Sequence, residues 1–172
     1  MHLEPFGSRF PELAFDECRF IIVQKPAGGV KESVPAAMYG LIEFYCSDRN
    51  CDCRRVTLQV AAMPAPQPLV TISYGFDRDD AMAGPFIDPL HRCCSYGNEL
   101  LALVEEQALA DPEYVARLER HYYQMKAATG SNPALLYRRL DPAAVQSLIA
   151  HKAASKKQRT KQLRLIQKRR AR

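Results

Sequence analysis

Three cysteines lie close together in a pattern that suits a metal ion. Cys46, Cys51 and Cys53 fall in the segment Y-C-S-D-R-N-C-D-C-R-R, residues 45–55, with the spacing C-x4-C-x-C. Aromatic and β-branched residues before the segment and an alternating run after it predict two antiparallel strands joined by a turn. Because such a turn brings the flanks of both strands together, the three thiolates can converge on one cation. Soft thiolates favour zinc, so we predict a Zn²⁺ site.

A closed tetrahedral zinc site needs a fourth ligand. The segment H-R-C-C-S, just before a predicted helix, offers three candidates. Cys94 is our choice because all-cysteine sites are a common structural form, and Cys93, His91 and Cys18 are the alternatives.

Other interpretations of the cysteines stay open. They can be buried thiols without a metal, three ligands of a zinc enzyme that keeps a position for water, or redox-active thiols. A disulfide framework is not expected in a reducing cytosol. Basic side chains in the same segment would offset the charge of the thiolates and lower their pKa. These are Arg49, Arg54 and Arg55.

The C-terminal segment is strongly basic. Residues 151–172 hold ten Lys or Arg and no acidic residue, whereas the rest of the chain has a net charge of −5. Clustered positive charge of this kind is typical of segments that contact phosphates, and no aromatic residue there indicates base stacking. We expect RNA, DNA or the ribosome as partner, with a solvated end, an acidic protein or a membrane surface as alternatives. The expected contacts are Lys156, Lys157, Arg159, Lys161, Arg164, Lys168, Arg169 and Arg170.

The order of the predicted elements indicates an α+β fold. We expect a small antiparallel β-meander with the cysteine-rich turn at one end, packed against two or three helices, and a long basic C-terminal helix or tail. Strands are predicted at 20–23, 39–46, 56–61 and 70–76, mostly from period-2 alternation.

Helices are predicted from about residue 95, from Asp111-Pro112 and from Asp141-Pro142, since Asp followed by Pro is a frequent helix start. His121, on the second helix, is interpreted as a partly exposed residue. Residues 1–140 are expected to form the zinc-binding domain and 141–172 the basic helix or tail.

Composition limits the class of protein. The chain has 172 residues, of which 47% are hydrophobic, which suffices for a folded core. Its opening residues lack the pattern of a signal peptide, and its apolar runs are far shorter than the roughly 20 residues that cross a bilayer. We therefore expect a cytoplasmic protein without a membrane span. No residue pattern indicates a substrate or a reaction.

The segment Y-G-L-I-E-F-Y-C-S-D-R-N-C-D-C-R-R-V resembles a signature of uncharacterised bacterial proteins, in which a strand ends in Y-C and resumes after C-D-C-R-R-V. The segment D-P-E-Y-V-A-R-L-E-R-H-Y, residues 111–122, is also similar to that group. The resemblance covers roughly residues 39–126 and implies no established activity. Some members have a further cysteine-rich tail, where this chain has the basic segment.

Overall fold

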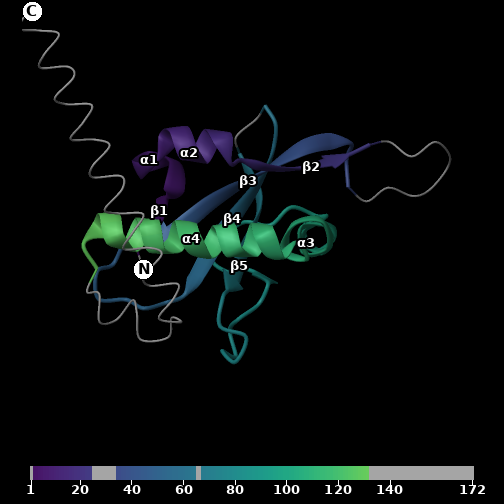
Figure 1. The fold of residues 1–172 in the computed structure, drawn as a ribbon. Coiled ribbons are helices and arrows are strands. Elements are labelled where there is room, and N and C mark those ends of the chain that lie inside the picture. The colour runs from purple at the N-terminus through teal and green to yellow at the C-terminus, as the bar shows by residue number, and fades with distance from the viewer. Residues whose placement is uncertain (1, 25–33, 65–66, 132–172) are drawn as a thin grey trace, which may run out of the picture. The chain divides into compact units, whose positions relative to one another are not determined.

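The computed structural model describes residues 2–24, 34–64 and 67–131, which all belong to one unit, Met1–Asn132. An antiparallel sheet in the order β1-β3-β4-β5-β6 forms its centre (Figure 1). The second strand also pairs with β3, along the same edge as β1. The bounds are β1 (Leu3–Pro5), β2 (Arg19–Val23), β3 (Ala37–Cys46), β4 (Arg55–Ala62), β5 (Pro68–Gly75) and β6 (Phe86–Ile87).

The described residues form two short helices near the N-terminus and two longer ones after the sheet. Helix α4 lies across one face of the sheet and contacts β3 and β4, while α3 contacts β5 (Figure 1). A π-helical turn, η1, connects these two helices. The bounds are α1 (Phe6–Arg9), α2 (Pro11–Asp16), α3 (Gly97–Val104), η1 (Glu105–Leu109) and α4 (Pro112–Thr129).

Helix α4 begins at the predicted Asp111-Pro112. The Asp111 carboxylate accepts hydrogen bonds from the backbone N–H groups of Glu113 and Tyr114, at 3.0 and 3.4 Å. These two groups have no partner within the helix, so the cap stabilises its first turn. Gly130 ends the helix in the left-handed conformation, with φ of 72°.

The alternating residues of β4 form the centre of the core. Val56, Leu58 and Val60 are fully buried, on the sheet face that α4 covers with Leu118 and Tyr122. The predicted antiparallel meander is therefore confirmed. The structure adds β1, α1, α2 and β6, which the sequence did not predict. The predicted third helix and the basic segment lie outside the described residues.

Candidate metal centre

The end of β3 and the start of β4 position three thiols side by side. Cys46 is the last residue of β3, and Arg55 begins β4, so Cys51 and Cys53 lie in the connection between two paired strands. The Sγ atoms of the three cysteines all lie within 4.8 Å of one another. Cys46 is buried and the other two are half-buried. The described residues therefore confirm the predicted convergence of these three thiols.

A lysine from α4 holds the cysteine turn in place. The Lys126 ammonium donates hydrogen bonds to the carbonyl oxygens of Asp48 and Cys51, at 2.8 and 2.7 Å. Within the turn, the Cys53 N–H donates to the Cys51 Sγ at 3.4 Å, and the Asn50 N–H to the Asp48 carboxylate at 2.9 Å. The turn is therefore tied to the helix by its backbone, which leaves its thiols free to face one another.

The pKa values of Cys51 and Cys53 depend on the neighbouring thiols. Burial raises the pKa of Cys51, but hydrogen bonds from Cys53 and Cys46 and the charge of Lys126 outweigh it, so its pKa is lowered overall. Burial, followed by the thiols of Cys51 and Cys46, raises the pKa of Cys53 well above its ordinary value. Thiolates this close to one another would repel, and a cation between them would offset that repulsion. This donor set fits a thiophilic metal such as zinc.

The cation that lowers the pKa of Cys51 is Lys126, whereas two of the predicted arginines bind other groups. Arg54 donates to the carboxylates of Asp77 and Glu119, at 2.8 and 2.6 Å. Arg55 donates to the Ser73 hydroxyl at 3.1 Å and to the carbonyl oxygen of Met82 at 2.9 Å. Both side chains are thus engaged elsewhere. The sequence interpretation missed Lys126 because its position 73 residues after Cys53 gives no local signal.

The structure does not bring the predicted fourth ligand to the cluster. The Cys94 N–H donates to the carbonyl oxygen of Leu69, near the start of β5, whereas Gly75 at the end of β5 pairs with Arg55 next to the cluster. At about 3.3 Å per residue, these positions on β5 are roughly 20 Å apart. In this structure Cys94 therefore lies away from the cluster, because the segment before α3 meets the opposite end of β5.

The alternative fourth ligands also lie elsewhere. His91 Nδ1 is 3.2 Å from a carboxylate oxygen of Asp88, and Cys93 is exposed just before α3. Cys18 lines a different cavity, together with Glu43. Over the described ranges, only Cys46, Cys51 and Cys53 form a group of three or more ligand atoms close enough for a metal.

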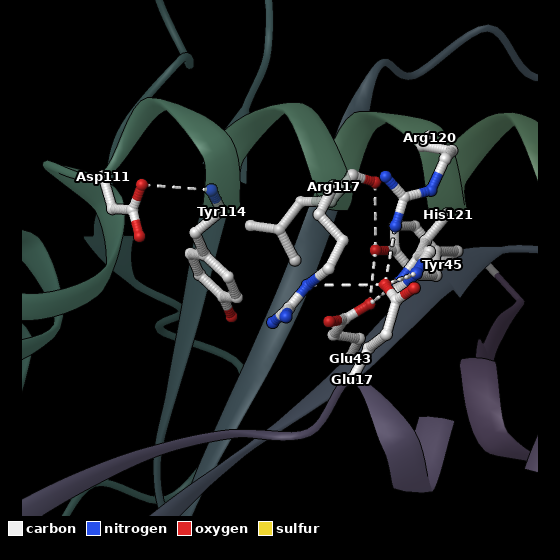
Figure 2. Close-up of polar contacts among 9 residues, drawn as sticks. Glu17, Glu43, Tyr45, Asp111, Tyr114, Arg117, Arg120 and His121 are labelled. Atoms are coloured by element: carbon white, nitrogen blue, oxygen red, sulfur yellow. Dashed lines mark hydrogen bonds and ion pairs between the residues drawn. The ribbon is translucent and has the colours of Figure 1, made fainter. Parts of the chain in front are cut away.

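A second polar cluster surrounds His121, which is buried rather than partly exposed (Figure 2). Its Nδ1 is 2.7 Å from a carboxylate oxygen of Glu43, and its Nε2 is 3.0 Å from one of Glu17. The Tyr45 hydroxyl donates to Glu43, and Arg120 to Glu17. Because both ring nitrogens already face carboxylates, the imidazole has no nitrogen left to activate a nucleophile or bind a metal.

The interpretation of His121 as partly exposed is therefore wrong. A signal was present in the sequence, since His121 lies three residues after Leu118 and four before Met125, on the apolar face of α4. Its partners come from α2's end and from β3, and no local pattern indicates them.

A small cavity of about 170 Å³ lies beside this cluster. Its walls are largely apolar, with Phe6 and Leu41 among them, and Glu17, Cys18 and Glu43 add polar groups. Burial and the carboxylate of Glu43 raise the pKa of Cys18, which disfavours a reactive thiolate. Cys18 is therefore not activated as a nucleophile.

Comparisons of the chain with protein-family models, curated proteins and solved structures find no match. The resemblance to uncharacterised bacterial proteins over residues 39–126 stays a prediction. In the part of the chain that the structure describes, no helix is both long enough and apolar enough to span a membrane.

Proposed function

We propose that the protein is a non-enzymatic zinc-binding module in which Cys46, Cys51 and Cys53 bind one Zn²⁺. The observation that carries this proposal is the convergence of their Sγ atoms within 4.8 Å of one another. A cation bound there would join the end of β3 to the turn that leads into β4. We expect its role to be structural, since binding a metal only in the folded state stabilises that state.

Metal analysis of the purified full-length chain tests this proposal. We expect about one zinc per chain in the wild type, and a large loss in Cys51→Ser, because a thiolate ligand is removed. Cys93→Ser is the matched control, since its thiol is exposed and lies away from the cluster. A folded wild-type protein that binds no metal would contradict the proposal. Disulfides formed without metal would favour the redox alternative instead.

We further propose that the basic C-terminal segment binds a polyanion, with RNA, DNA or the ribosome as the expected partners. The support is its charge, ten Lys or Arg without an acidic residue in residues 151–172. Phosphate contacts made by such a segment release counterions, so affinity falls as salt rises. The segment lies outside the described residues, so the polyanion proposal rests on the charge pattern of the sequence.

A mobility-shift assay tests the polyanion proposal. The full chain and a chain without residues 151–172 are titrated with a nucleic acid of mixed sequence, at two salt concentrations. We expect the full chain to bind, more weakly at higher salt, and the shortened chain to lose most of this affinity. Equal binding by both chains would remove the proposed role of the segment.

A further inference from the structure

Lys126 is a buried cation that donates hydrogen bonds to the cysteine turn. Its side chain is 0% exposed, although it lies in the last turn of α4. The ammonium donates to two backbone carbonyl oxygens, of Asp48 and Cys51, and lies 5.8 Å from the centre of the Tyr122 ring. Among the described residues, no carboxylate lies within ion-pair distance of it.

This arrangement differs from that of the other inward-facing cations. Arg54 pairs with Asp77 and Glu119, and Arg117 lies 3.8 Å from Glu17. Carbonyl oxygens satisfy the N–H groups of an ammonium but do not neutralise its charge. A fully buried charge is costly without an opposite charge nearby. A group of opposite charge is therefore expected close to Lys126. The hydrogen bonds of Lys126 go to the backbone of the turn that carries the thiols, so the cysteine cluster is the candidate.

We propose that Lys126 neutralises the metal centre, which is a divalent cation held by three thiolates and a neutral fourth ligand. This inference rests on the proposed function. Three thiolates and one divalent cation have a net charge of −1, which a single ammonium balances. A fourth thiolate would leave the site at −2 against one positive charge, and a monovalent cation with three thiolates would do the same.

The positions of the remaining thiols agree with a neutral fourth ligand. Cys94 lies near the start of β5, Cys93 is exposed before α3, and Cys18 lines the cavity beside Glu43. A water molecule, or a neutral donor from a partner, satisfies the fourth position without adding charge. The chain would then supply three of the four ligands, and the fourth ligand would add no charge.

Zinc affinity, measured by competition with a chromophoric chelator, tests the role of the charge. We expect Lys126→Met to weaken binding by about 10–100-fold, because a neutral chain of similar length leaves the thiolate centre unbalanced. Lys126→Arg keeps the charge and should recover most of the affinity. Arg120→Met, which removes a cation from the same helix beside Glu17, should bind like the wild type.

The outcomes separate this inference from the proposed function. A wild type that binds no zinc contradicts the proposed function itself. A wild type that binds zinc, with Lys126→Met binding equally well, overturns the inference alone. Equal weakening in Lys126→Met and Lys126→Arg would also overturn it, since packing and not charge would then be responsible.

The fourth ligand is tested without changing Lys126, so the test holds even if Lys126→Met fails to fold. Cobalt is bound to the wild type in place of zinc, and the sulfur-to-cobalt charge-transfer absorption per bound cobalt is recorded. We expect the same intensity in Cys18→Ser, Cys93→Ser and Cys94→Ser, and a lower one in Cys51→Ser. A loss of intensity in any of the first three would reveal a fourth thiolate and overturn the neutral ligand.

Discussion

The ring of Phe6 stacks on the imidazole of His121, with ring centroids 4.0 Å apart and planes inclined by 10°. Phe6 begins α1, and His121 lies in the middle of α4, so the contact joins the N-terminal segment to the helix that covers the sheet. Glu17 and Glu43 bind the edges of the same imidazole. His121 therefore links α4 to three other parts of the fold.

Replacement of His121 by Ala should destabilise the protein strongly. The change removes the ring that Phe6 stacks on and leaves Glu43, whose side chain is only 9% exposed, without its nearest nitrogen. Leaving a buried polar group without its hydrogen-bond partner costs about 1–3 kcal/mol of unfolding free energy, and more when that group is charged. Urea denaturation followed by circular dichroism measures this difference.

His91→Ala serves as the control for that experiment. His91 is exposed, and its imidazole pairs with the nearby Asp88, so we expect a change within about 0.5 kcal/mol. Similar losses in both variants would contradict the role of the buried cluster.

The cap of α4 should contribute measurably to stability. Asp111→Ala removes the acceptor for the N–H groups of Glu113 and Tyr114, and we expect a loss of about 0.5–2 kcal/mol. Asp111→Asn keeps a capping oxygen and should lose less. The same denaturation experiment checks this, and equal losses in the two variants would show that the charge of Asp111 near Arg19 matters more than the cap.

Alkaline pH should destabilise the fold through its buried tyrosines. Burial, with the charge of Glu43, raises the pKa of both Tyr45 and Tyr114 above the ordinary value of 10.0. Above pH 10 the unfolded chain loses these phenolic protons, whereas the folded protein keeps them. The unfolded state then binds fewer protons, so the free energy of unfolding falls as the pH rises.

Tyr114→Phe isolates one of these two contributions. The Tyr114 hydroxyl is buried and has no hydrogen-bond partner in the described part of the chain, so the variant should keep its stability at neutral pH within about 1 kcal/mol. Its stability should fall less steeply than that of the wild type between pH 9 and 11. Parallel pH curves for the two proteins would contradict the assignment.

Removal of the metal should destabilise the wild type and leave a ligand variant unchanged. If zinc binds Cys46, Cys51 and Cys53, a chelator should lower the Tm of the wild type by about 5 °C or more. The same chelator should have no effect on Cys51→Ser, which starts without the metal. Thermal melts give the Tm of both proteins with and without chelator. An equal shift in the two proteins would indicate a non-specific effect of the chelator.

Local patterns in the chain were sufficient for the four strands β2 to β5 and for the three proposed thiol ligands. Alternation in residues 56–60 predicts a strand with one buried face, and Asp111-Pro112 and Gly130 mark the two ends of α4. Cys46, Cys51 and Cys53 span one turn, so any antiparallel pairing of its flanks brings them together. Each of these features depends on residues that are close in the sequence. The backbone and side-chain preferences of a few neighbouring residues are therefore enough to predict it.

Tertiary structure decided the rest. The elements in residues 3–16 are too short to show a period, and they form against β3 and α4. Cys94 was chosen by residue type, but the direction of β5 places it at the far end of the sheet. Lys126 reaches the cysteine turn, and His121 reaches Glu17 and Glu43, across 75 to 104 residues of chain. Such contacts depend on how the whole chain folds back on itself, and no short stretch of sequence encodes them.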